Sequence, residues 1–109
     1  MPPSRLDLLR QLLSESPEDS FLLFALAKEY EKLEDWQEAL SWYLRLLKQD
    51  TTYIGTYYHL GKLYEKLDQP QKARSTYTQG METARQQGDQ HALSELAGAR
   101  LALGDEDDY

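Results

Sequence analysis

The stretch that decides the fold is LGKLYEKL at residues 60–67, because a nearly identical stretch, LAKEYEKL, occupies residues 26–33. Sliding the sequence against itself by 34 residues aligns 20–53 with 54–87 and gives ten identical pairs. These pairs are Leu26/Leu60, Lys28/Lys62, Tyr30/Tyr64, Glu31/Glu65, Lys32/Lys66, Leu33/Leu67, Gln37/Gln71, Ala39/Ala73, Ser41/Ser75 and Tyr43/Tyr77. A fixed period of this length is the signature of a repeat architecture.

The composition favours helices. The 109 residues include no Val, no Cys and a single Ile, and their apolar content is mostly Leu and Ala. Strands are usually built from β-branched residues, whereas Leu and Ala are good helix formers. The sequence therefore predicts an all-α fold and excludes both a β-sandwich and a disulfide scaffold.

Apolar residues inside each repeat follow a helical spacing of three and four. In the first copy one set predicts a helix before residue 34, and a second set predicts another helix after residue 37. The two sets are Leu23, Leu26, Ala27 and Tyr30, then Ala39, Tyr43, Leu46 and Leu47. In the second copy the break at 68–71 contains Asp68, a candidate cap, and Pro70, which suits the first turn of a helix. Each copy is therefore expected to be a helical hairpin.

These residues resemble the tetratricopeptide repeat family, whose members carry a Leu-Gly-x-x-Tyr pattern followed by an Ala and an aromatic residue. The second copy has this pattern at 60–64, with Ala73 and Tyr77 after it, and the first has Ala27 in place of the Gly. The resemblance implies a right-handed α-solenoid of antiparallel hairpins with about six helices. It also implies a non-enzymatic protein-binding role, with the first helix of each hairpin lining a concave groove.

The repeat register extends beyond the two copies. Residues 4–15 are expected to be the second helix of a truncated leading repeat, with Ser4-x-x-Asp7 as its capping box. Residues 16–19 (SPED) are expected to start the next helix in the same way. Residues 90–103 are predicted to form a C-terminal capping helix, and 105–109 an acidic tail. The expected organisation is one domain over residues 1–104.

Charge and hydropathy limit the partners and the location. The net charge is −7, and residues 105–108 contribute four of the negative charges. Tyr53, Tyr57 and Tyr58 are candidates for base stacking, but nucleic-acid binding needs clustered Lys and Arg, so helix packing is the preferred interpretation. The longest apolar run, 21–27, is too short to span a bilayer, which needs roughly 20 residues. We expect no nucleic-acid partner, no membrane partner and a cytoplasmic location.

Signals of catalysis are absent from the sequence. His59 and His91 have no metal-ligand spacing, there is no Cys nucleophile, and the glycines form no phosphate-binding loop. His59 is interpreted as a packed or half-exposed ring, and Glu29 with Lys32 as an ion pair on a solvated face. We expect no enzyme activity, no catalytic residue, no cofactor and no metal.

The resemblance places seven candidate partner-binding residues on the first helices: Phe21, Phe24, Lys28, Lys32, Tyr58, Lys62 and Lys66. Four Lys against Glu31 and Glu65 give this surface a local charge of +2, which suits a peptide with acidic side chains or a free carboxylate and an apolar anchor. The alternative is that the Lys and Glu residues only pair with each other, which requires no function. The family's chaperone-binding carboxylate clamp is disfavoured because the sequence has no Asn.

The C-terminal helix offers a second surface. Its apolar residues spread over more than one face: Leu93, Leu96, Ala97, Leu101 and Leu103. One interpretation is a modest apolar strip for a weak homodimer, which would make the protein a homo-oligomeric scaffold. The other is fraying of the last helical turn.

Overall fold

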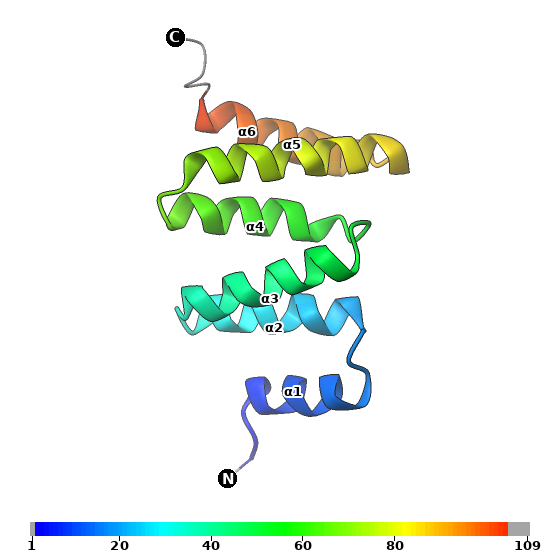
Figure 1. Cartoon of the computed structure of the whole chain (residues 1–109), viewed down its shortest axis with the longest axis vertical. Coiled ribbons are helices and arrows are strands. Elements are labelled where there is room, and N and C mark those ends of the chain that lie inside the picture. Colours follow the sequence, from blue (N-terminus) through cyan, green and yellow to red (C-terminus); the bar gives the residue numbers. More distant parts are fainter. Residues whose placement is uncertain (1, 105–109) are drawn as a thin grey trace. The chain divides into compact units, whose positions relative to one another are not determined.

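The computed structural model describes residues 2–104 and contains six α-helices in that range, with no strand (Figure 1). The helices are α1 (Arg5–Glu15), α2 (Ser20–Lys32), α3 (Trp36–Gln49), α4 (Gly55–Lys66), α5 (Pro70–Gln87) and α6 (Gln90–Leu103). The prediction of an all-α fold built from helical hairpins is confirmed. The acidic tail assigned to 105–109 lies outside the described residues.

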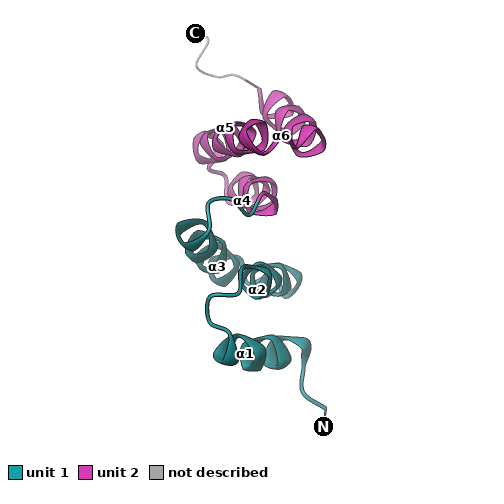
Figure 2. Cartoon of the chain, turned by 90° about the vertical axis from the view of Figure 1, so that its right-hand side faces the viewer, with its two compact units in different colours: residues 1–53 teal, residues 54–109 magenta. Residues whose placement is uncertain are grey.

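The chain divides into two compact units, residues 1–53 and residues 54–109 (Figure 2). The first holds α1, α2 and α3, and the second holds α4, α5 and α6. The division falls between residues 53 and 54, where the second copy of the sequence repeat begins. Each unit therefore contains one complete hairpin and one additional helix.

The first unit has its core between α2 and α3. The fully buried side chains there are Leu23, Leu26, Ala27, Ala39, Tyr43 and Leu46. On the other side of α2, helix α1 buries Leu9 and Leu13. This packing depends on three helix-spaced leucines and two small residues on α2 and α3, as the periodicity predicted.

Polar contacts also hold α1 against α2. The Arg5 guanidinium lies 3.2 Å from the carboxylate of Glu29, and the Arg10 guanidinium donates a hydrogen bond to the hydroxyl of Tyr30. Glu29 is buried, so the expected solvent-exposed pair with Lys32 is wrong. The repeat period within the hairpins carried no information about this contact, because the partner of Glu29 comes from the preceding helix.

The second unit packs α5 between α4 and α6, and α6 also contacts α4. Its core includes Tyr57, Leu60, Leu63, Ala73, Tyr77, Ala84 and Leu96. Two glycines permit this packing. A Cβ atom on Gly61 would overlap the ring of Tyr77, and one on Gly80 would lie 2.5 Å from the Cβ of Tyr57. Both glycines are therefore required by close helix approach.

Some helix ends agree with those predicted from the sequence, and others differ. The Ser4–Asp7 capping box and Pro70 in the first turn of α5 are as predicted, and α5 ends at Gly88, with φ of 69°. The start of α2 differs, because the Asp19 side chain accepts the hydrogen bond from Leu22 N, and Ser16 instead ends α1.

The start of α5 also corrects an expectation. Its N-cap is Gln69, which makes no side-chain cap hydrogen bond, so Asp68 does not cap this helix. Asp68 instead has a positive φ of 60°, as Glu34 does at the equivalent place in the first hairpin. A left-handed residue reverses the chain directly after the first helix, and this geometry decides the role of position 68.

We predict that Gly61→Ala lowers the free energy of unfolding by about 1–3 kcal/mol, because the new methyl group overpacks the Tyr77 ring. Urea denaturation measures this change. Gly98→Ala is the matched control, since its Cβ would meet nothing within 4 Å, and Ala is the better helix former by about 0.5–1 kcal/mol. Equal losses in the two variants would contradict the packing role of Gly61.

Candidate functional site

The predicted partner-binding residues of the first unit lie on α2. Phe21, Lys28 and Lys32 are exposed, and Phe24 is half-buried. The Phe24 ring lies with its centroid 6.2 Å from that of Tyr43 and 5.5 Å from that of Tyr53. Phe24 is thus a partly accessible aromatic residue whose orientation is fixed by two neighbouring rings.

Tyr53 belongs to this aromatic cluster although it was not among the predicted site residues. It follows α3, outside the helical apolar spacing, so no pattern in the sequence placed it beside Phe24. Burial, with Asp19 and Asp50 nearby, raises the pKa of Tyr53. A tyrosine hydroxyl is protonated at neutral pH even at its ordinary pKa of about 10, so this shift leaves Tyr53 a hydrogen-bond donor there.

The predicted residues of the second unit lie on α4. Tyr58 is half-buried, Lys62 and Lys66 are exposed, and the Lys62 ammonium lies 5.8 Å from the centroid of the Tyr58 ring. The ring of His59 meets Tyr58 edge-on at 5.5 Å and is half-buried, as the packed-ring interpretation expected. Aromatic and cationic groups therefore share one helix surface here.

Both units contain the same three-residue arrangement of a Lys, a Glu and a Tyr. In the first, the Lys28 ammonium lies 3.9 Å from Oε1 of Glu31, and the hydroxyl of Tyr43 donates to the same oxygen. In the second unit Lys62, Glu65 and Tyr77 repeat these contacts, again through one shared carboxylate oxygen and with a 3.9 Å ion pair. We call each set a Lys–Glu–Tyr triad.

The tyrosine is the fixed member of each triad. Tyr43 and Tyr77 are fully buried, and burial together with the neighbouring carboxylate raises the pKa of both hydroxyls well above 10. Each hydroxyl is thus a permanent donor that holds the glutamate in place. The lysines have side chains 43% and 48% exposed, where an ion pair contributes only about 0–1 kcal/mol.

Sequence reasoning treated Tyr43 and Tyr77 as packing residues and missed their hydroxyl contacts. The signal was present in the repeat, because Glu31/Glu65 and Tyr43/Tyr77 are identical pairs with the same separation. Helical periodicity identifies which side a residue faces, but it does not show which group on the next helix a hydroxyl reaches.

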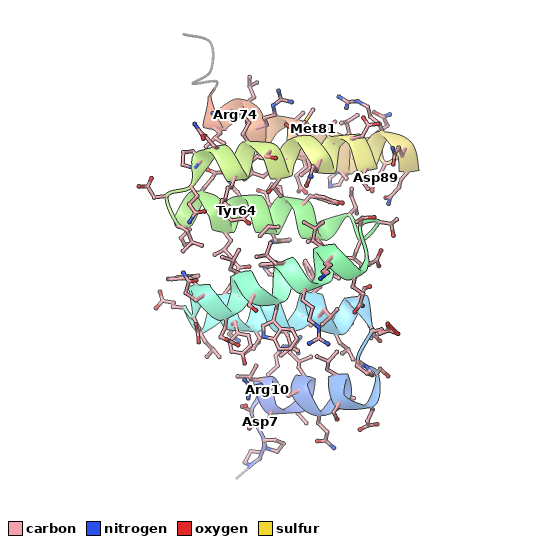
Figure 3. The ribbon with its side chains drawn as sticks, viewed as in Figure 1. Asp7, Arg10, Tyr64, Arg74, Met81 and Asp89 are labelled. Atoms are coloured by element: carbon pink, nitrogen blue, oxygen red, sulfur yellow. The ribbon has the colours of Figure 1, made fainter. Side chains whose placement is uncertain are left out.

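A pocket of about 290 Å³ opens between α5 and α6 in the second unit. Its lining residues are Arg74, Met81, Ala97, Arg100, Leu101 and Gly104. The Arg74 guanidinium donates to the carbonyl of Gly104 at 2.8 and 3.3 Å, and an Arg100 nitrogen lies 3.9 Å from the Met81 sulfur; Figure 3 labels Arg74 and Met81. The sequence had marked Ala97 and Leu101 as part of an apolar strip, but not this pocket.

Within residues 2–104, none of the helices is both long and apolar enough to cross a membrane. No group of three or more His, Asp or Glu side chains in the same range lies close enough together to hold a metal ion.

Comparison with known proteins identifies the family. Models of the tetratricopeptide repeat match residues 22–52 and 54–87, and together these segments cover more than half of the chain. The chain belongs to the tetratricopeptide repeat family, which is generally a fold for protein interaction.

Individual relatives agree with this assignment. A TPR repeat-containing protein of Pseudomonas aeruginosa is 30% identical over 88 residues, which is 81% of this chain and 84% of that protein. The solution structure of a tetratricopeptide repeat domain protein from Salinibacter ruber has a TM-score of 0.79 and 46% identity, covering 85% of this chain and 94% of its own. The solution structure of a protein from Bordetella parapertussis has a TM-score of 0.82 and 27% identity, and the match covers 97% of this chain and 92% of that one.

We predict that stability falls as the pH rises above 10, because folding raises the pKa of Tyr43 and Tyr77. A raised tyrosine pKa contributes stability that is complete below the unfolded pKa of about 10 and is lost at higher pH. Urea denaturation at pH 8 to 12, with tyrosinate absorbance, measures this loss.

The double variant Tyr43→Phe/Tyr77→Phe provides the comparison. We expect it to lose about 1 kcal/mol per hydroxyl at pH 8, because each glutamate loses a hydrogen bond. It should also show a shallower decline above pH 10. A slope identical to that of the unmodified protein would contradict the role of these two tyrosines.

Proposed function

We propose that this tetratricopeptide repeat protein is a non-enzymatic module that binds a peptide or partner segment along the concave groove characteristic of its family. The observation that carries the proposal is the Lys–Glu–Tyr triad beside a half-buried aromatic residue, which occurs on α2 and again on α4. A packing requirement alone explains the tyrosines, but it does not require an exposed Lys at both positions.

The proposed ligand carries acidic side chains or a free carboxylate, together with an apolar anchor. Lys28, Lys32, Lys62 and Lys66 supply the positive charge. The anchor is received by the aromatic residues Phe21, Phe24 and Tyr58. Of these, Phe24 and Tyr58 are oriented by neighbouring rings, which reduces the conformational entropy lost on binding. The module is proposed to act in the cytoplasm.

The two glutamates do not cancel the attraction of this surface for acids. Each carboxylate accepts a hydrogen bond from a buried tyrosine, which holds it against the hairpin. The lysine side chains are also more exposed than the glutamates that they pair with, 43% against 18% in the first unit and 48% against 30% in the second. An incoming acid therefore approaches the lysines first, and its attraction is screened by salt.

We predict that Lys28→Glu/Lys62→Glu weakens binding of selected peptides at least tenfold. The probe is a displayed random-peptide library presenting both internal and C-terminal sequences, with affinities of enriched peptides measured by fluorescence anisotropy. Enriched peptides should carry Asp, Glu or a C-terminal carboxylate near an apolar residue. Their affinity should fall as salt concentration rises.

Lys48→Glu is the matched control, because Lys48 is exposed and lies on a second helix, α3. It changes the net charge by the same amount per site but leaves the α2 and α4 surfaces unchanged. Peptides that lose affinity equally in Lys48→Glu and in the double variant would show general electrostatics only. A library that yields no binding peptide would overturn the proposal.

A further inference from the structure

Helix α2 is buried over most of its surface, and one row of its side chains is accessible. From residue 21 onward every residue of α2 is buried except five, and these recur at intervals that place them on one face of the helix. We call them the α2 row: Phe21, Phe24, Lys28, Glu31 and Lys32. The row is aromatic near the start of the helix and charged near its end.

Helix α4 carries a corresponding row, but only its charged half matches. At the repeat offset of 34 residues the charged half is identical, with Lys62, Glu65 and Lys66. In the aromatic half, Gly55 replaces Phe21 and Tyr58 replaces Phe24. One aromatic side chain is therefore lost on α4, and the other gains a hydroxyl group.

The aromatic half of the α2 row is extended by neighbouring rings. Phe21 and Phe24 lie one turn apart on the same face, and Phe21 is 61% exposed. The half-buried Phe24 ring is held between Tyr43 and Tyr53, with centroid distances of 6.2 and 5.5 Å. An apolar side chain can cover this surface at a low cost in entropy, because the rings beneath it are already ordered.

The same place in the second unit is surrounded by polar groups. The ring of His59 meets Tyr58 edge-on at 5.5 Å, and the Lys62 ammonium lies 5.8 Å from the centroid of the Tyr58 ring. At the repeat position of Tyr53 stands Gln87, the last residue of α5. An apolar side chain placed against Tyr58 would remove water from an ammonium and an imidazole, which costs free energy unless these groups find new partners.

The charges at the two ends of α2 differ in sign. Asp19 caps the start of the helix, and Asp50 accepts a hydrogen bond from Ser20 in its first turn. Lys28 and Lys32 lie toward the other end. A carboxylate of a ligand is therefore attracted to the lysine side of the aromatic residues and repelled from the aspartate side.

We propose that the two repeats bind different parts of one acidic peptide. Phe21 and Phe24 on α2 bind its single large apolar side chain, with a carboxylate of the peptide toward Lys28. The α4 row, through Tyr58 and Lys62, binds only acidic or polar groups of the peptide. This inference rests on the proposed function and narrows it, because it assigns the apolar anchor to the first unit alone.

The test compares a peptide that the displayed library enriches on the unmodified protein with the same peptide whose apolar residue is changed to Ala. Fluorescence anisotropy measures the affinity of both peptides. For the unmodified protein, the change in the peptide should lower affinity about tenfold or more. For Phe24→Ala it should lower affinity by less than about threefold, because the group that the side chain contacts is already gone. For Tyr58→Ala the full effect should remain.

Tyr58→Ala is the matched control for Phe24→Ala, because both residues are half-buried and occupy the same repeat position. Circular dichroism melts check that both variants fold. Phe21→Ala provides a second variant whose fold is not at risk, since this side chain is 61% exposed. It should also reduce the effect of the apolar residue in the peptide.

Two results overturn this inference and leave the proposed function intact, provided that Lys28→Glu/Lys62→Glu still weakens binding. One is a Tyr58→Ala variant that reduces the effect of the apolar residue as much as Phe24→Ala does. The other is a full effect in both Phe21→Ala and Phe24→Ala. A library without any binding peptide overturns the proposed function and this inference together.

Discussion

The rest of the structure depends on one contact, in which a buried tyrosine of the second helix packs against a small residue of the first helix of the same hairpin. In the second unit the ring of Tyr77 occupies the space that a side chain on Gly61 would fill. Ala27 and Tyr43, at the same repeat positions, are both fully buried in the first unit. Since two helices approach closely only where one has little or no side chain, this contact sets how the hairpin closes.

The polar surface follows from the same contact. A tyrosine packed in this way has its hydroxyl at a fixed place, where it donates a hydrogen bond to the carboxylate of Glu31 or Glu65. That carboxylate in turn positions a lysine one turn earlier on the exposed side of the first helix. Packing in the core and charge on the surface are thus linked through three residues, and the link recurs because the repeat recurs.

The flanking helices show what happens where the tyrosine is absent. In α1 the 34-residue register places Leu9 at the tyrosine position, and in α6, which aligns with α4 at an offset of 36 residues, Leu101 stands at the glutamate position. Each substitution replaces a polar partner with an apolar one, and the face beside it is open to solvent at Leu12 and at Leu101. The repeat pattern is therefore continued by both helices, with different chemistry at the same positions.

The sequence alone determined the class of fold, a count of about six helices and the approximate bounds of the first and last of them, because a 34-residue period and helical apolar spacing are local properties that one-dimensional comparison detects. It also located α6 at 90–103, as the structure has it. Caps at Asp19 and Gln69 were not foreseen, because several polar residues near a helix start are equivalent until the turn geometry selects one. Only the tertiary structure decided that Glu29 pairs with Arg5, that Tyr53 joins Phe24, and that the repeated tyrosines hold the repeated glutamates. Such contacts join residues on different helices, and their distances depend on how closely those helices pack.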